Sequence, residues 1–397
     1  MMRRRSFLAA GLGTGASLAW MGTAFGARSD PILVRVFLRG GLDGLNAIVP
    51  FADDAYYAAR PTIGVPRPKA EGGALSLDGR FGLHPSLRSL VPMYRERSLA
   101  FVQAVGSPAP TRSHFDAQDH MEAGSLTGRA RAGWLGRVRG QLGESDFAAV
   151  SMQDALPLAL VGGDAIALGR LDKFGFAGGE SVRARSERGF AALYTGDDGL
   201  VSPAGRRALS AVARVRALSP GSYRPAEGVD YGQGSAATQL RDLAMLIKAQ
   251  VGLRVATVDV GGWDTHTGQR ARLDRELLRL GTALSGFHRD LGDRMANVLV
   301  LVVSEFGRTV EENGSGGTDH GHGTVMMMLG GPVRGGRVYG RWPGLTKPQR
   351  YQGRDLEVTT DFRAVFGEAL EKHLAVSKAS RTLFGEERPP VPLGFLR

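Results

Sequence analysis

Apolar, β-branched runs alternate along the chain with stretches of helical periodicity. Five runs have the length and composition of buried strands, at residues 32–38, 99–105, 253–260, 297–304 and 324–330. Residues 243–250 have helical spacing, and a second helix with one buried face is indicated by apolar residues at three- and four-residue steps: Leu277, Leu280, Leu284, Phe287 and Leu291. This alternation predicts an α/β fold, with a mostly parallel central sheet and helices on both faces.

Between these elements the chain offers no clean domain boundary. The Pro/Gly-rich segments 60–73 and 219–235 read as long surface loops. No internal repeat is visible, and the 57 glycines among 397 residues favour many tight turns. We therefore expect residues 28–397 to form a single domain.

The first 27 residues have the order of an export signal. Arginines at positions 3–5 precede a short apolar run, and small residues surround positions 24–27. The stretch "RRSFL" at positions 4–8 resembles a twin-arginine signal. An uncleaved anchor is the alternative, although the run is shorter than the ~20 residues of a spanning helix. The prediction is export to the periplasm or cell envelope, with no integral membrane span after signal removal.

Composition narrows the possible chemistry. The chain has no cysteine, which excludes disulfides, thiolate metal sites and cysteine nucleophiles. Any metal must then be held by Asp, Glu, His or hydroxyl ligands. The formal charge is +11, but the arginines are scattered and do not cluster with aromatic residues as nucleic-acid binding would require. We expect no nucleic-acid partner, whereas binding to an anionic envelope polymer stays open.

Chemically capable side chains gather where the predicted strands end. They are Asp43 and Asn46 after the first strand, Thr111, Arg112, Ser113, His114 and Asp116 after the second, Asp264 and His266 after the third, Glu305 at the end of the fourth, and Asp319, His320 and His322 before the fifth. In open parallel sheets, ligands bind beyond the carboxyl ends of the strands, so these clusters can converge on one pocket. Carboxylates and imidazoles with a hydroxyl at a helix start suit a metal site with a nucleophile.

Each cluster also has a structural interpretation. Asp43 would serve as a turn former, and Ser113 as a helix N-cap with Asp116 at the third helical position. Asp264 and His266 would form a surface pair, and Glu305 would bind Arg308 or a loop amide. The His-rich loop before the fifth strand would be disordered. His84 and His120 are expected to be structural or incidental.

Several motifs, in this order, carry a family resemblance: "FLRGGLDGLNAIVP", "FGLHPSL", "SHFDAQDHMEAG", "GGWDTH" and "SEFGRT…N…GTDHG". The chain resembles a large bacterial family of twin-arginine-exported proteins that is classed as a domain of unknown function. That family is regarded as a relative of the alkaline phosphatase/sulfatase superfamily. The resemblance covers almost the whole mature chain and implies an alkaline-phosphatase-like fold with one or two divalent metal ions at the strand ends.

The resemblance also implies roles for individual residues. Asp43, Asp264, His266 and Glu305 match metal-binding positions, as does His320 or His322, with Asp319 a possible substitute ligand. Ser113, or failing it Thr111, sits where the nucleophile belongs, and Arg112 or Arg308 would hold the anionic group. Asn46 is a further candidate substrate-binding residue. Phe306 stands where a ligand histidine is expected, which leaves a two-metal site open.

These roles imply a metal-dependent hydrolase acting on a small phosphate or sulfate ester. The cofactor would be a divalent ion such as Zn²⁺, Mn²⁺ or Ca²⁺. Two alternatives stay open: a non-catalytic cell-envelope binding or scaffolding protein on the same fold, and a polyanion-binding surface protein whose binding depends steeply on salt.

Overall fold

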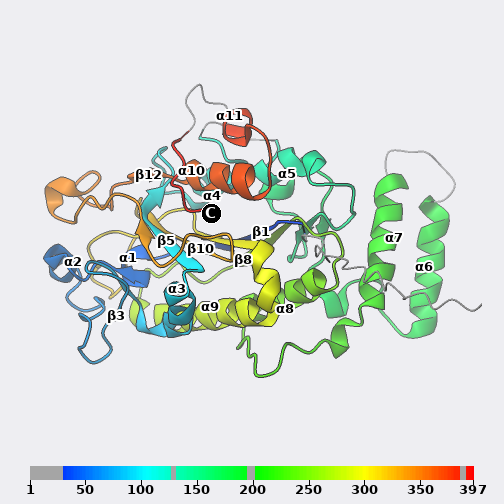
Figure 1. The fold of residues 1–397 in the computed structure, drawn as a ribbon, viewed down its shortest axis with the longest axis horizontal. Helices are drawn as coiled ribbons and strands as arrows, with labels where there is room; N and C mark the ends of the chain where they lie inside the picture. Colours follow the sequence, from blue (N-terminus) through cyan, green and yellow to red (C-terminus); the bar gives the residue numbers. More distant parts are fainter. Residues whose placement is uncertain (1–29, 127–130, 195–201, 385–389) are drawn as a thin grey trace, which may run out of the picture.

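In the computed structural model, a central sheet separates two layers of helices (Figure 1). The structure describes residues 30–126, 131–194, 202–384 and 390–397. The predicted signal, residues 1–27, lies outside the described residues. Among the described helices, none is long and apolar enough to cross a membrane.

The main sheet follows the strand order β11-β5-β10-β9-β1-β8-β6-β7, and β12 also pairs with β5. Its strands are β1 (Ile32–Leu38), β5 (Leu99–Gly106), β6 (Ala149–Ser151), β7 (Ile166–Ala167), β8 (Val255–Val260), β9 (Val298–Val303), β10 (Thr324–Leu329), β11 (Val338–Tyr339) and β12 (Thr360–Asp361). All pairings are parallel except those of β10 with β5 and β9. The predicted mostly parallel sheet is confirmed, and the five predicted strands correspond to β1, β5, β8, β9 and β10.

The reversed direction of β10 matters for the site. Because β10 runs antiparallel to β5 and β9, its first residue lies at the edge where those strands end. Loops that follow β1, β5, β8 and β9 therefore meet the loop that precedes β10. The sheet brings together groups that lie far apart in sequence, as in the hydrogen bond from Thr324 Oγ1 to the carbonyl of Leu42, 282 residues away.

Strand β1 shows how the sheet is buried on both faces. Val34 and Val36 pack in one hydrophobic cluster with helices α8 (Ser235–Lys248) and α9 (Gln269–Leu291). Leu33 and Phe37 point to the opposite face and its separate cluster, as the two-residue period of a strand requires. That second face is covered by α4 (His114–Ala123), α5 (Trp134–Val138), α10 (Phe362–Glu368) and α11 (Ala379–Phe384).

The remaining elements lie at the periphery. Near the start of the chain are α1 (Gly44–Ala47), α2 (Asp54–Ala59), α3 (Val91–Arg95) and a small antiparallel sheet of β2 (Ile48–Val49), β4 (Gly82–Leu83) and β3 (Leu75–Ser76). Two helices, α6 (Glu180–Tyr194) and α7 (Ser202–Ala217), stand side by side at one end of the molecule (Figure 1).

The buried carboxylate of Asp290 ties the end of α9 to the loop before α8. It accepts hydrogen bonds from the hydroxyls of Tyr223 and Tyr231, at 2.6 and 2.7 Å, and from the Ala226 backbone N–H at 2.6 Å. It also pairs with the Lys248 ammonium. Burial alone would raise the pKa of Asp290, but these donors hold it below its usual value.

Asp290→Asn is expected to lower the free energy of unfolding at neutral pH by about 1.5–3 kcal/mol, because a charge-assisted network is lost. With its pKa lowered in the folded state, Asp290 stabilises the fold above the ordinary carboxyl pKa. That contribution disappears as the pH falls through the lowered value. Urea titrations at neutral and acidic pH should therefore show the variant and wild type converging in acid. The exposed Asp293→Asn is the control, and an equal loss in both variants at neutral pH would contradict this role.

Candidate metal centre

Four side chains meet at the carboxyl edge of the sheet. His114 is the first residue of α4, just beyond β5. Asp264 and His266 lie in the loop that follows β8, and His320 lies in the loop that precedes β10. His114, Asp264 and His320 offer ligand atoms that all lie within 4.8 Å of one another, so they form a group that could hold a metal ion.

Hydrogen bonds at Nδ1 fix the orientation of all three imidazole rings. His320 Nδ1 lies 2.9 Å from the Arg112 carbonyl oxygen, which can only accept, so this nitrogen carries the proton. His114 Nδ1 lies 2.8 Å from Glu305 Oε1, and His266 Nδ1 lies 2.9 Å from Asp319 Oδ1. In the tautomer that carries its proton on Nδ1, the lone pair of each Nε2 points toward the centre of the cluster, and this is the tautomer that can bind a metal ion there.

The Nε2 atoms converge at distances that suit coordination. His320 Nε2 lies 3.0 Å from Nε2 of both His114 and His266. Asp264 Oδ1 lies 3.0 Å from His266 Nε2 and 3.5 Å from His320 Nε2, and Asp264 Oδ2 lies 3.7 Å from His114 Nε2. Ligands about 2.0–2.1 Å from a tetrahedral ion are roughly 3.3 Å apart. At these distances the Nε2 lone pairs and the Asp264 carboxylate repel one another. A cation bound between them would turn this repulsion into attraction.

Charged neighbours set the ionisation of the cluster. Burial would raise the pKa of Asp264, but the Arg308 guanidinium, 2.6 Å away, holds it below its usual value. Burial likewise opposes ionisation of Glu305, whose pKa is nevertheless lowered by hydrogen bonds from His114, Gln118 and the Gly40 N–H. The pKa of His320 is lowered, chiefly by burial. Carboxylates with neutral imidazoles are the protonation states that bind metal.

Glu305 and Asp319, both predicted as metal ligands, lie outside the centre of the cluster. Each carboxylate binds the Nδ1 side of a histidine, and Glu305 is additionally bonded to Gln118 Nε2 at 2.9 Å and Ser304 Oγ at 3.1 Å. Carboxylates that bind the distal nitrogen of a ligand histidine fix its tautomer and orientation. The structure therefore gives these two residues an orienting position.

The chain turns directly after β1 at a glycine that packs against the cluster. Gly40 has φ +121°, and a Cβ there would lie 2.6 Å from the Asp264 backbone nitrogen. Its N–H donates to Glu305 Oε1 at 2.8 Å. Only glycine allows this backbone conformation and this close approach together.

Arg308, predicted to bind substrate, is buried and donates hydrogen bonds to five protein groups. Its guanidinium is buried and donates to the carbonyl oxygens of Gly41 at 2.8 Å and Thr318 at 3.1 Å, as well as to Asp264. A second pair of carbonyls, those of Gly40 and Trp263, also accepts from it. The structure thus places Arg308 as the residue that holds the Asp264 carboxylate and the surrounding loops.

Asp43, predicted as a metal ligand, faces an arginine. Its Oδ2 accepts from Arg60 Nη1 at 2.7 Å, and both side chains are essentially inaccessible to solvent. Arg60 also donates to Asn46 Oδ1 at 2.6 Å and to the carbonyls of Thr309 and Val310. The guanidinium therefore supplies the positive charge that Asp43 would otherwise share with a metal ion.

A chain of hydrogen bonds connects Asp43 to the cluster. Gln269 Nε2 donates to Asp43 Oδ2, and Gln269 Oε1 accepts from the hydroxyls of Thr265 at 2.9 Å and Thr318 at 2.6 Å. These two threonines lie beside Asp264 and His266, and beside Asp319. Asp43 thus braces the loops that carry the cluster.

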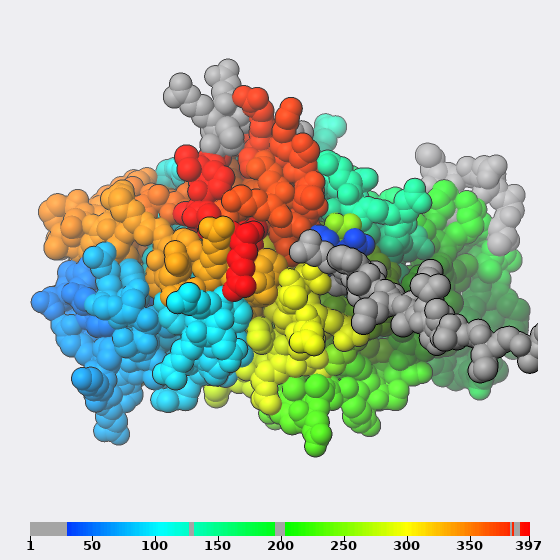
Figure 2. Space-filling view, in the orientation of Figure 1, coloured from blue at the N-terminus to red at the C-terminus, as the bar shows by residue number. Residues whose placement is uncertain are grey.

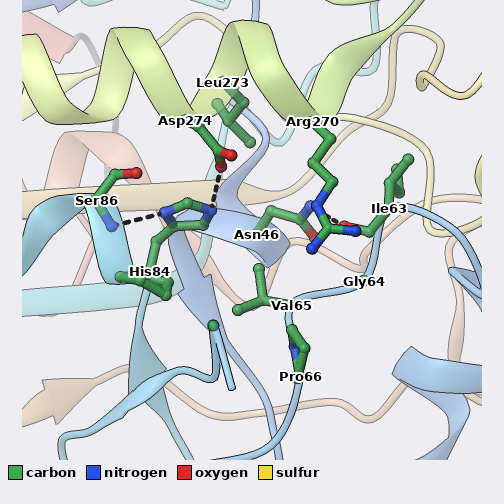
Figure 3. Close-up of a pocket in the computed structure, with 12 residues that line it drawn as sticks. Asn46, Ile63, Gly64, Val65, Pro66, His84, Ser86, Arg270, Leu273 and Asp274 are labelled. Carbon is green, nitrogen blue, oxygen red and sulfur yellow. Dashed lines mark hydrogen bonds and ion pairs between the residues drawn. The ribbon is translucent and has the colours of Figure 1, made fainter. Parts of the chain in front are cut away.

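Asn46, predicted to bind substrate, lines a separate small cavity of about 140 Å³ (Figure 3). Its amide donates to the Ile63 carbonyl at 2.9 Å, and its oxygen accepts from Arg60 and Tyr56. In the same cavity His84 accepts from the Ser86 N–H and pairs with Asp274 at 3.1 Å. Its hydrogen bonds give His84 the structural role expected from the sequence. None of the residues lining this cavity belongs to the histidine cluster.

His322 points away from the cluster that holds His320. Its Nε2 lies 3.0 Å from the Ser107 carbonyl, its ring packs against Tyr351, and burial lowers its pKa. Arg112 and His322 line a hollow of about 190 Å³, where the Arg112 guanidinium is bound by Asp355. The Arg112 side chain is about two-fifths exposed, and its carbonyl is the group that fixes His320.

Ser113 occupies the N-cap of α4, as its structural interpretation predicted. Its Oγ accepts from the Asp116 N–H at 3.4 Å, and its own N–H donates to Thr111 Oγ1 at 3.2 Å. Ser113 directly precedes His114 in the sequence, and its hydroxyl stands at the helix start. Both candidate nucleophiles, Ser113 and Thr111, lie on this turn.

From the sequence, His114 was placed in a strand-end cluster but was assigned no role as a ligand. In the stretch "SHFD" it follows the N-cap serine, and the functional role was assigned to the hydroxyl of that serine. The sequence did contain a signal that could have identified His114 as a ligand. This histidine follows a predicted strand, as His266 does, in a chain with eight histidines in all. The three histidines of the cluster come from different connections at the sheet edge, and His114 is the one that follows β5.

Comparisons with known proteins give a partial family match. A family described as "Protein of unknown function (DUF1501)" matches residues 209–375, which include Asp264, His266, Glu305, Asp319 and His320 but not His114. This match agrees with the resemblance drawn from the motifs. A search of curated proteins finds no match.

Two solved structures show distant similarity. One is the PsFucS1 sulfatase from Pseudoalteromonas sp., with 13% identity and a TM-score of 0.40 over 93% of this chain and 73% of that one. The other is alkaline phosphatase from the Antarctic bacterium TAB5, with 9% identity and a TM-score of 0.29 over 78% of this chain and 95% of that one. The fold class rests on the strand order and pairing described above.

Proposed function

We propose that the histidine cluster binds one divalent metal ion and that the protein is an exported hydrolase of small phosphate or sulfate esters. The observation that carries the proposal is the convergence of three Nε2 atoms and the Asp264 carboxylate, with every Nδ1 bonded to an acceptor. His114, Asp264 and His320 would hold the ion, with His266 as the fourth ligand. Three histidines and a carboxylate favour Zn²⁺ over Ca²⁺, which prefers oxygen ligands.

When bound, the ion would polarise the ester oxygen and lower the pKa of a nearby hydroxyl. The protein's own residues would orient the metal-binding histidines and bind the anionic group of the substrate. Glu305, Asp319 and the Arg112 carbonyl hold the rings in one tautomer. The start of α4 offers backbone N–H groups and the positive end of the helix dipole to an anionic group. This proposed pairing of a cation with a helix N-terminus supports an anionic ester as the substrate.

Ser113 is the proposed nucleophile, and Arg112 the proposed anion-binding side chain. A bond from Ser113 Oγ to the phosphorus or sulfur atom would form as the ester bond breaks, with the serine proton leaving on the expelled alcohol; water would then hydrolyse the seryl ester and release phosphate or sulfate. Arg112 is the partly exposed guanidinium on the same turn; its Nη2 donates to both Gln352 and Asp355, so releasing Gln352 would free one N–H of that nitrogen. The proposed location is the periplasm or cell envelope, because the first 27 residues have the pattern of an export signal.

Ser113→Ala is expected to lower turnover of an aryl phosphate, phosphodiester or aryl sulfate by orders of magnitude, with metal still bound. Loss of the cap alone would cost about 0.5–2 kcal/mol of stability and leave turnover unchanged. The assay adds Zn²⁺, Mn²⁺ and Ca²⁺ in turn and compares wild type with Ser113→Ala and Ser113→Asp, since aspartate keeps a cap but not a hydroxyl. If Ser113→Ala turns over as fast as wild type, the role passes to Thr111 or to water.

A non-catalytic binding or scaffolding protein is the second candidate function. The observation in its favour is the buried ion pair of Asp43 with Arg60, which occupies a position that the resemblance assigns to a metal ligand. Absence of turnover of all three substrates by metal-loaded wild type would favour this candidate. Metal would then affect only stability.

A further inference from the structure

We propose that the helical hairpin of α6 and α7 docks on the surface of an anionic lipid bilayer. The hairpin stands at one end of the molecule, away from the small sheet and α2 (Figure 1). Helix α6 is 15 residues long and none of its residues is buried. A helix of this length ordinarily buries one face against its own protein. The outer face of α6 therefore lacks a partner within the described chain.

One side of α6 is accounted for by α7. Glu187 pairs with Arg216 of α7, and the Tyr194 ring lies against Gly205. Phe190 packs on Tyr194, with ring centroids 4.6 Å apart. At about 100° per residue, these three residues of α6 share one face of the helix.

A different face of α6 exposes aliphatic side chains. Val182 is 54% exposed and Leu193 is 73% exposed. They lie eleven residues apart, which is about three helical turns, so they project from the same face. This face points about a quarter turn or more away from the residues that contact α7.

Exposed arginines lie on either side of this aliphatic face: at about 100° per residue, Arg185 is turned about 60° from Val182 in one direction and Arg183 about 100° in the other, with Arg188 further round the helix. Arg183, Arg185 and Arg188 are all exposed on α6. Of the two acidic residues on this helix, Glu187 is already paired with Arg216. Arginine beside exposed aliphatic groups suits a surface that offers both negative charge and an apolar layer, which describes the headgroup region of anionic lipid.

Figure 2 shows the space-filling surface in the same orientation, with the green hairpin at one end and the body of the sheet and its helices beside it. Docking through this end would keep the protein peripheral, since none of the described helices can span a bilayer. Because attraction to anionic lipid is largely electrostatic, the binding would weaken at high salt.

The test is co-sedimentation of the full chain with vesicles made of equal parts phosphatidylglycerol and phosphatidylcholine. Two variants alter the proposed surface: Val182→Ser with Leu193→Ser, and Arg183→Gln with Arg185→Gln and Arg188→Gln. The matched control alters an exposed surface of α9, with Leu278→Ser, Arg272→Gln and Arg275→Gln. All proteins keep the same residues 1–29, and circular dichroism checks their folding.

Each hairpin variant should bind these vesicles at least about tenfold more weakly than wild type, whereas the α9 control should bind within about twofold. Wild type should bind pure phosphatidylcholine far more weakly. Equal binding by wild type and both hairpin variants would overturn the proposal. So would retention of binding by the Val182/Leu193 variant together with competition by soluble dextran sulfate, because the partner would then be an anionic polymer.

Discussion

Replacement of Arg60 by methionine is expected to lower the free energy of unfolding by about 3–5 kcal/mol, the cost of leaving a buried charge without its partner. The Asp43 carboxylate is only 1% exposed, and Arg60 Nη1 lies 2.7 Å from it. Methionine fills much of the same volume but supplies no charge. It also leaves the carbonyls of Thr309 and Val310 without their donors. Urea denaturation, with the change in midpoint converted through the slope, measures the loss.

Two further variants separate charge from packing. Arg67→Met breaks an exposed ion pair with Asp54 and should cost less than about 1 kcal/mol. Adding Asp43→Asn to Arg60→Met removes the orphaned charge and should recover part of the stability. If Arg60→Met cost no more than Arg67→Met, the buried pair would not have the role assigned to it.

Metal affinity should respond in a graded way to substitutions around the histidine cluster. His320→Ala removes a proposed ligand at the centre and should abolish stoichiometric binding. Glu305→Gln keeps the ligands but weakens the orientation of His114, and should reduce affinity about 10–100-fold. Competition with a chromogenic chelator measures both. The accompanying loss of metal-dependent stabilisation should appear as a lower melting temperature.

His322→Ala is the matched control for His320→Ala, because it removes a second histidine from the same loop. His322 bonds the Ser107 carbonyl and not the cluster, so this variant should keep its metal affinity while losing some stability. Equal affinity losses for His320→Ala and His322→Ala would indicate a local binding loop rather than the cluster at the sheet edge.

The strand pattern predicted the five longest strands of the sheet, and the strand-end clusters predicted the sheet edge where the candidate site lies; the short strands β6, β7, β11 and β12 were not predicted. Mostly apolar runs identified β1, β5, β8, β9 and β10, because strands buried on both faces are rich in apolar residues. The convergence of Asp264, His266 and His320 follows from the topology: loops after parallel strands meet at one edge. Antiparallel β10 brings the loop before it to that same edge.

Individual roles depended on contacts that sequence spacing does not reveal. The glycine-rich turn around Asp43 gives no sign that Arg60, 17 residues later, will fill the space beside it. His320 and His322 are two residues apart, yet only His320 Nε2 reaches the cluster. Whether a carboxylate such as Glu305 coordinates a metal or orients a ligand depends on differences of a few ångströms.

The central claim is that His114, Asp264, His266 and His320 bind one divalent ion. The most direct test is a crystal structure of protein incubated with Zn²⁺, with diffraction data collected on both sides of the zinc absorption edge. The account predicts one anomalous peak, about 2.0–2.2 Å from Nε2 of each histidine and from an Asp264 oxygen. No peak at the cluster, or a peak bound by Asp43 or His322 instead, would contradict it.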